Sequence, residues 1–420
     1  MRIGAQAHLT YCSNIHPGET WPEVQANIER HVPAIRDRLA PEAVFGIGLR
    51  LSARAAAELA EPATLEAFQD FLAENGLYVF TLNGFPYGTF HGTRVKEAVY
   101  QPDWRDPERL RYTNQLADLL AALLPDHDDI EGTVSTVPGA FKPEVRSAAD
   151  VAAMADHLLQ HAAHLVELHR RTGRSIALAL EPEPHCFLET VAETIAFFRD
   201  HLHSAAAQAR LATLTGLTEA DAGIALRRHL GVCHDLCHAA VEFEDPLRSL
   251  DDLEAAGITI GKLQISAGLR IEALTPEAMQ ALEAFQDPVY LHQVVESAAG
   301  GVRRFVDLPE AFASVPGASA AGAREWRVHF HVPVFLEALG AFGSTQGFVR
   351  AVLARHRERP VSRHLEVETY TWNVLPEHLR TVDMTEAIAR ELAWVREQLA
   401  TVVPGNERPL RDSELPRVKT

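Results

Sequence analysis

The stretch SIALALEPEPH, residues 175–185, runs from apolar residues straight into two glutamates and two prolines. Its apolar part has the length of a buried strand, and the prolines end it. Longer amphipathic stretches separate it from similar runs along the chain, which predicts strands that alternate with helices. The other predicted strands of this series are 3–9, 45–51, 77–82, 130–137, 230–233, 258–265 and 364–370.

Strands that alternate with helices pair in parallel through right-handed crossovers. Eight of them favour closure into a single (β/α)8 TIM barrel, which we expect over residues 1–403. The main helices are expected at 22–39, 62–74, 107–124, 148–171, 188–203, 246–256, 345–357 and 385–399.

Two insertions and a C-terminal tail depart from this alternation of strands and helices. Residues 204–228 are predicted to add helices, and an excursion over 267–325 precedes the last barrel strand. The excursion contains a possible hairpin, 290–296 with 303–305, turned at two glycines, and a further strand is expected at 326–332. Residues 404–420 are polar, contain three prolines and are expected to form a loose tail.

Composition excludes several function classes. The 420 residues carry a net charge of −18, which opposes binding to nucleic acid or to an anionic membrane surface. With 47% hydrophobic and 23% charged residues, the chain is globular. Four cysteines exclude a disulfide scaffold. No apolar run is long enough to insert into a membrane or to act as a signal peptide, so we expect a cytoplasmic protein with reduced thiols.

Polar residues gather where the predicted strands stop, at the end of a barrel that normally carries the active site. Glu181 follows the fifth strand, Asp235 the sixth, Gln264 lies in the seventh and Glu368 in the eighth. Neighbouring carboxylates repel one another unless a cation lies between them. Oxygen ligands favour Mg²⁺ or Mn²⁺, and nearby imidazole would allow Mn²⁺, Co²⁺ or Zn²⁺. His238, three residues after Asp235, could touch the substrate or brace the ligands.

Each of these residues also has a structural interpretation. Glu181 could cap the next helix, and Asp235 could be the N-cap of the following turn. Gln264 is nearly as well explained as a buried amide bonded to the backbone. Glu366 and Glu368 fall on the same face of the last strand, so one could bind metal while the other acts as a base or pairs with Lys262 or Arg50.

Further polar residues stand at or near other strand ends and are candidates for substrate binding. Arg50 could hold an anion such as phosphate. Two histidines alternate with apolar residues and therefore share one side, which is either a second lining of the pocket or a solvent face. The candidate substrate-binding residues are His8, Arg50, Asn83, Lys142, His329 and His331.

These motifs resemble the xylose-isomerase-like superfamily of sugar-phosphate isomerases and epimerases, with Glu, Asp-x-x-His, Gln and Glu at successive strands. More specifically, the chain is similar to the metabolite traffic protein EboE family. The resemblance implies a TIM barrel with a role in making or exporting a metabolite, alongside pathway proteins. It rests on HLTYCSNIHPGETW (8–21), FGIGLRLS (45–52), LYVFTLNGFPYGTFH (77–91), LEPEP (180–184), CHDLCHAAVEFEDP (233–246), KLQIS (262–266), WRVHFHVPVF (326–335) and HLEVETYTW (364–372).

The leading functional hypothesis is a metal-dependent isomerase or epimerase of a polyhydroxylated small molecule, such as a sugar phosphate or a cyclitol. Glu181 and Glu368 would hold the metal and shuttle a proton, while His238 and Arg50 orient the substrate. One alternative is a metal-dependent phosphoesterase of the same superfamily, which uses several zinc ions and many histidines. The other is a non-catalytic metabolite-binding protein. No dinucleotide-binding or P-loop motif follows any predicted strand.

Overall fold

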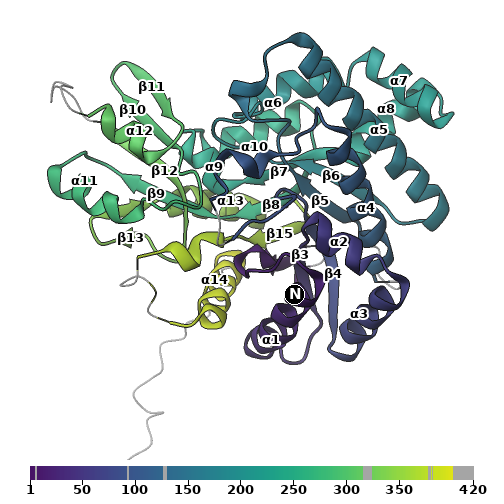
Figure 1. Ribbon diagram of the computed structural model, residues 1–420, viewed down its shortest axis with the longest axis horizontal. Helices are drawn as coiled ribbons and strands as arrows, with labels where there is room; N and C mark the ends of the chain where they lie inside the picture. Colours follow the sequence, from purple (N-terminus) through teal and green to yellow (C-terminus); the bar gives the residue numbers. More distant parts are fainter. Residues whose placement is uncertain are drawn as a thin grey trace, which may run out of the picture.

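The computed structural model describes residues 1–4, 7–91, 94–125, 130–315, 324–376, 380 and 382–400. Within them, eight parallel strands form a (β/α)8 barrel (Figure 1). A two-residue strand, β1 (Arg2–Ile3), pairs antiparallel with the first of them. The predicted tail at 404–420 lies outside the described residues. The barrel strands are β2 (Ala7–Tyr11), β3 (Phe45–Arg50), β4 (Leu77–Asn83), β5 (Gly132–Thr136), β6 (Ile176–Leu180), β7 (Leu230–Asp235), β8 (Ile260–Ile265) and β15 (His364–Val367).

The barrel closes between β2 and β3. Cys12, just after β2, forms a parallel bridge with Gly48 of β3. The Thr10 hydroxyl donates to the carbonyl of Gly46 (2.8 Å) and accepts from the amide of Gly48 (3.1 Å). A side chain therefore supplies part of the pairing that joins the two ends of the sheet.

Helices surround the barrel, and most begin at the capping residues that the sequence shows. Thr20 with Glu23, and Ser147 with Asp150, form capping boxes. Gly173 ends the longest helix in the left-handed conformation. The helices of the barrel and of the first insertion are α1 (Trp21–Leu39), α2 (Ala53–Leu59), α3 (Pro62–Glu74), α4 (Pro107–Leu123), α5 (Ala148–Thr172), α6 (Val191–Phe197), α7 (Ala205–Thr215), α8 (Glu219–His229), α9 (Leu236–Val241), α10 (Pro246–Ala255), α13 (Gln346–Glu358) and α14 (Met384–Leu399).

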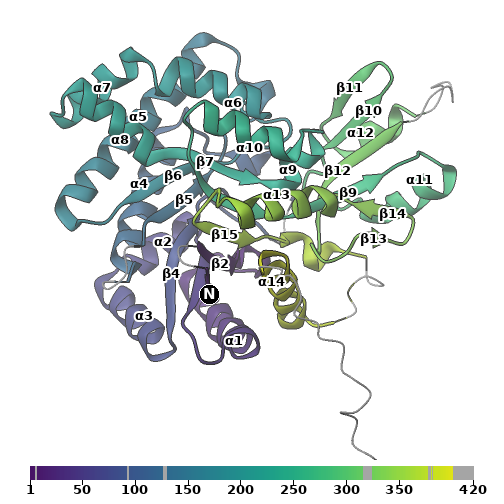
Figure 2. The same ribbon diagram turned by 180° about the vertical axis from the view of Figure 1, so that it is seen from behind.

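The second insertion builds a six-stranded antiparallel sheet with two short helices, α11 (Pro276–Leu282) and α12 (Leu308–Ala313). Figures 1 and 2 both show it beside the barrel, next to α9, which contacts β9 and β12. The sheet continues past 325, where the predicted excursion ends, because its later strands pair with β9. Its strands are β9 (Ala267–Ile271), β10 (Val294–Ala298), β11 (Gly301–Phe305), β12 (Glu325–Val332), β13 (Ala338–Leu339) and β14 (Phe342–Ser344).

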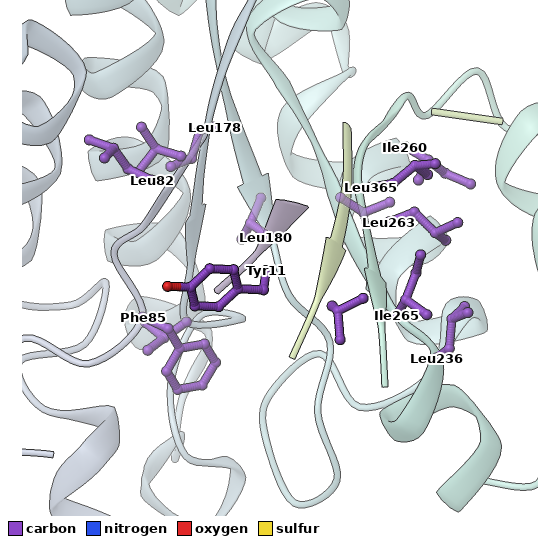
Figure 3. Close-up of a cluster of buried hydrophobic side chains, with 14 of the residues drawn as sticks. Tyr11, Leu82, Phe85, Leu178, Leu180, Leu236, Ile260, Leu263, Ile265 and Leu365 are labelled. Atoms are coloured by element: carbon purple, nitrogen blue, oxygen red, sulfur yellow. The ribbon is translucent and has the colours of Figure 1, made fainter. Parts of the chain in front are cut away.

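Side chains of the barrel strands alternate between a polar interior and an apolar outer layer. The Lys262 ammonium lies inside the barrel, where it donates to Glu366 (2.8 Å) and to the Ser135 hydroxyl (3.3 Å). The intervening residues belong to the buried apolar cluster, part of which is drawn in Figure 3: Leu178, Leu180, Leu263, Ile265 and Leu365. The residues of the candidate site belong to this polar interior. No described helix is long and apolar enough to cross a membrane.

Candidate metal centre

Three carboxylates converge at the carboxyl ends of the barrel strands. Glu181 directly follows β6, Asp235 ends β7, and Glu368 directly follows β15. One oxygen of each lies within 4.8 Å of the others. All three residues are at least 96% buried. The structure thus brings together the three acids that were predicted as metal ligands, and their binding of a metal stays a prediction.

Two oxygens in this group lack a hydrogen bond within the described residues: Glu181 Oε2 and Asp235 Oδ2. A buried charged oxygen without a partner is strongly unfavourable, so each such atom calls for a ligand. Asp235 Oδ1, in contrast, accepts from the backbone amide of His238 (2.9 Å) and from the Ser266 hydroxyl (2.7 Å). Hydrogen bonds therefore hold Oδ1 of Asp235 in place, while Oδ2 stays available to a ligand.

The three carboxylates differ in their affinity for protons. Burial, and then the nearby charges of Asp235 and Glu366, raise the pKa of Glu368 to about 8. Burial and the charges of Glu368 and Asp235 raise the pKa of Glu181 well above its usual value. Burial opposes the charge of Asp235, but His238, His331 and the hydrogen bonds from the His238 amide and the Ser266 hydroxyl together lower the pKa of this carboxyl. Without a cation, the group therefore holds protons near neutral pH.

Gln264 lies between two of the acids. Its Nε2 donates to Glu181 Oε1 (3.1 Å), and its Oε1 accepts from the Cys233 thiol (3.4 Å). In this orientation the amide is a donor to the carboxylate. To ligate a metal it would have to turn its oxygen inward, so its role as a ligand stays a prediction.

Two asparagines fix Glu368. Asn14 donates to Glu368 Oε1 at 2.7 Å and Asn83 donates to the same oxygen at 3.3 Å. Asn14 lies in the short 3-10 helix η1 (Ser13–Ile15), whereas Asn83 ends β4. Asn83 was predicted at the site, but nothing in the local pattern singles out Asn14. Only the closure of the barrel brings η1 beside the last strand.

Three histidines form a second cluster against the carboxylates. Nε2 of His238 lies 3.0 Å from Nε2 of His329, which lies 3.3 Å from Nε2 of His331. His238 belongs to α9, and the other two to β12 of the second sheet. All three are at least 96% buried. Both β12 histidines therefore face the interior: His329 meets His238, and His331 lies close to Asp235 and His238.

The hydrogen bonds of these rings fix where their protons lie. Nδ1 of His238 bonds the Pro182 carbonyl (2.9 Å), and Nδ1 of His331 bonds the Glu368 carbonyl (3.0 Å). A carbonyl only accepts, so each Nδ1 carries the hydrogen. Nδ1 of His329 likewise bonds Oε1 of Gln293 (2.8 Å), whose amide nitrogen donates to the Pro184 carbonyl (3.2 Å).

In the neutral rings, all three Nε2 atoms therefore present lone pairs to one another. Burial lowers the pKa of His331 to about 4 and lowers that of His329 well below its usual value. Facing lone pairs at this distance repel, and a shared cation removes the repulsion. Oxygen and nitrogen donors together suit Mn²⁺, Zn²⁺ or Co²⁺, so these residues fit a divalent metal.

A cavity of about 60 Å³ lies over the carboxylates. Glu181, Glu183 and Glu368 line its polar side together with His238 and His329. The sequence analysis did not select Glu183, whose Oε1 accepts from the hydroxyl of Tyr100 (2.7 Å) and from Gln293 (3.1 Å). The EPEP motif at residues 181–184 could have indicated Glu183 from the sequence alone. Tyr100, which ends the short 3-10 helix η2 (Lys96–Tyr100), belongs to an aromatic stretch that the sequence offers as a possible cover of the site, whereas Gln293, in the loop before β10, has no such signal.

Glu366 and Glu368 occupy different depths of the barrel. Glu366 pairs with Lys262, and both side chains are fully buried. Glu368 lies with Glu181 and Asp235 at the strand ends. The geometry therefore favours Glu368 as the metal ligand, with Glu366 as the partner of an internal lysine.

Three predicted substrate-binding residues lie away from the cavity. Nδ1 of His8 is 2.7 Å from the Tyr78 hydroxyl, inside the barrel. The Arg50 guanidinium donates to the carbonyls of Gly18 (2.9 Å) and Gly88 (2.6 Å) and pairs with Glu19. Arg50 therefore braces loops, because its donors are directed at them.

Lys142 is also engaged elsewhere, in ion pairs with Glu189 (2.5 Å) and Glu193 (2.8 Å). It lines a separate surface pocket with α6. The proposed site consequently leaves out His8, Arg50 and Lys142.

No protein-family model matches the chain, and no curated protein matches it. Among solved structures, it is similar to the probable 3-DHS dehydratase AsbF from Bacillus anthracis, at 12% identity and a TM-score of 0.46. That match covers 92% of this chain and 97% of the other.

The chain is similar to two further solved structures. A xylose isomerase domain protein from Planctomyces limnophilus has 12% identity and a TM-score of 0.46, covering 88% of this chain and 92% of the other. The IolI protein, solved with a bound zinc atom, has 10% identity and a TM-score of 0.43, covering 93% and 98%.

Proposed function

We propose that the protein is a divalent-metal-dependent isomerase or epimerase of a polyhydroxylated small molecule, of the sugar phosphate or cyclitol type. The observation that carries the proposal is the convergence of Glu181, Asp235 and Glu368 with two buried oxygens unpartnered among the described residues. When bound there, a divalent cation supplies Lewis acidity to adjacent hydroxyl and carbonyl oxygens. Mn²⁺ and Mg²⁺ suit the carboxylates, and Zn²⁺ or Co²⁺ the nearby imidazoles.

The protein's own groups would move the proton. One of the two glutamates, Glu181 or Glu368, accepts a proton from a carbon of the substrate. The other glutamate returns a proton to the neighbouring carbon or oxygen. Glu368 is a candidate for this proton transfer because its side chain lines the cavity. Glu181 faces it from β6, and Nε2 of His238 would orient a substrate hydroxyl. Burial keeps bulk water away from the transfer.

The resemblance to the metabolite traffic protein EboE family supports a place in the making or export of a metabolite. The resemblance implies pathway partners and a small-molecule substrate. The net charge of −18 agrees with a substrate other than nucleic acid.

Metal analysis by inductively coupled plasma mass spectrometry tests the proposal. Wild-type protein dialysed against Mn²⁺ should retain at least one ion per chain, and Glu181→Gln should retain less than about a tenth of that. Glu391→Gln is the matched control, because it makes the same change at a buried glutamate of α14. Full metal retention by Glu181→Gln, or none by the wild type, would overturn the proposal.

The histidine cluster favours a second candidate function, a phosphoesterase with two metal ions. Two ions side by side can hold both the attacking and the leaving oxygen of a phosphoester. The same measurement separates the candidates: two ions per chain, with one lost in His329→Ala, would favour the phosphoesterase. Hydrolysis of p-nitrophenyl phosphate that disappears in His329→Ala would then identify the activity.

A further inference from the structure

The cavity over the metal centre is lined by two kinds of side chain. Carboxylates, imidazoles, two asparagines and Lys96 are polar, whereas the other side chains, here called the roof, are apolar or aromatic. The roof residues come from the β4–α4 connection, from the second sheet's loop and from the segment after β15. They are Phe85, Pro86, Phe90, Val95, Val99, Tyr100, Tyr290, Leu291 and Tyr370.

Three of these rings pack against one another. Phe90 lies 5.2 Å from Tyr290 and 5.4 Å from Tyr370, and the two tyrosine rings are 5.2 Å apart, measured between centroids. Each residue is at most 9% exposed. Because the cavity is only about 60 Å³, a ligand of ordinary size has to separate these rings. The rings then lose contact with one another. An apolar surface of the ligand can replace this contact, whereas a polar group of the ligand would lose its water there.

The charges around the cavity oppose a ligand phosphate at the roof. Among the described residues that line it, Lys96 is the only lysine or arginine. Its ammonium donates to Asp307 (2.7 Å) and to the Asp287 carbonyl (3.3 Å), so its charge is already compensated. Arg50 lies beyond Phe90, 5.8 Å from its ring centroid, and donates to backbone carbonyls. A phosphate here would face Glu183 without a free cation.

We propose, on the basis of the proposed function, that the substrate pairs a chelating edge with an apolar ring or alkyl portion and carries no phosphate away from that edge. The chelating edge is a pair of adjacent oxygens directed at Glu181, Asp235 and Glu368. The apolar portion lies between Phe90, Tyr290 and Tyr370. This narrows the substrate class from sugar phosphates to unphosphorylated ring compounds with vicinal oxygens.

Three hydroxamates test this inference, since they share one chelating group and differ in the rest of the molecule. The probes are acetohydroxamate, benzohydroxamate and phosphonoacetohydroxamate, titrated calorimetrically into Mn²⁺-loaded protein. Benzohydroxamate should bind at least about tenfold more tightly than acetohydroxamate, because its ring buries more apolar area. Phosphonoacetohydroxamate should bind more weakly than acetohydroxamate.

Two variants of Tyr290 test whether the roof causes the preference for benzohydroxamate. Tyr290→Ala should reduce the advantage of benzohydroxamate to about threefold or less and leave acetohydroxamate binding unchanged, whereas Tyr290→Phe should keep the advantage. Equal affinities, or tightest binding of the phosphonate, would overturn this inference while the proposed function stands. No metal uptake together with no binding of any probe would overturn both.

Discussion

At the scale of single residues, the last barrel strand shows how depth separates two identical side chains. Glu366 and Glu368 share one face of β15, and the sequence leaves open which of them binds metal. The Lys262 ammonium, 2.8 Å from Glu366, compensates the deeper one. Glu368, two residues further along the chain, receives hydrogen bonds from the side-chain amides of Asn14, Asn83 and Gln264 and has no lysine or arginine partner among the described residues. The buried Lys262 of the neighbouring strand β8, 104 positions away in sequence, therefore assigns the two roles.

Another buried acid, Glu391 of α14, gives a prediction on pH and stability. Burial raises its pKa to about 7, although Thr369 and the Val334 amide donate to it. A raised pKa means that the native state binds the proton more tightly than the unfolded chain. Its stabilising contribution is complete below about pH 4.5 and is lost as pH rises through about 7.

Glu391→Gln mimics the protonated acid and keeps an acceptor oxygen for both donors. From about pH 5 to pH 8 the free energy of unfolding of the wild type should fall by about 3 kcal/mol relative to this variant. Urea unfolding at several pH values measures this difference. Parallel curves for the two proteins would contradict the prediction.

At the scale of elements, the barrel strands are the part that local pattern describes well. Each apolar run from β3 to β8 appears within two or three residues of its predicted bounds. The short helices α2 and α9 have no prediction of their own, because six or seven residues give too little periodicity. The pairing across the β2–β3 seam is also absent from local pattern, since it depends on the Thr10 hydroxyl.

Gly48 of β3 tests that seam. A Cβ placed there would lie 2.0 Å from Glu366 Oε1 and 2.6 Å from the Tyr11 carbonyl, so the buried ion pair and the backbone would both have to shift. Gly48→Ala should therefore lower the free energy of unfolding by about 3 kcal/mol. Gly261→Ala is the matched control in β8, where the nearest atom is 3.6 Å away.

Chemical denaturation of the two glycine variants measures the effect. The control should change stability by less than about 1 kcal/mol. Similar losses in both variants would show that close packing at the seam is not the cause.

At the scale of the whole molecule, the second sheet completes the site that the barrel begins. It supplies His329 and His331 from β12 and Gln293 from the loop before β10. The barrel alone would leave His238 without its two imidazole neighbours. The insertion is therefore part of the proposed catalytic machinery.

A metal held between parts far apart in sequence should stabilise the entire fold. At a hundredfold excess of Mn²⁺ over its Kd, binding should add about 2.7 kcal/mol to the free energy of unfolding and raise Tm by roughly 3 °C. Differential scanning calorimetry with and without Mn²⁺ measures this shift. Asp235→Asn should abolish it, and an equal shift in that variant would place the ion elsewhere.

The sequence by itself determined the alternation of strands and helices, the eight-strand barrel and the acids at its strand ends. Those follow from hydrophobic periodicity and from the rule that parallel strands present their carboxyl ends together. Only the tertiary structure decided which glutamate Lys262 compensates, that Arg50 and Lys142 turn away, and that an aromatic roof closes the pocket. Such choices depend on contacts between residues far apart in sequence, from 32 positions between Arg50 and Gly18 to 354 positions between Asn14 and Glu368, and no local pattern encodes them.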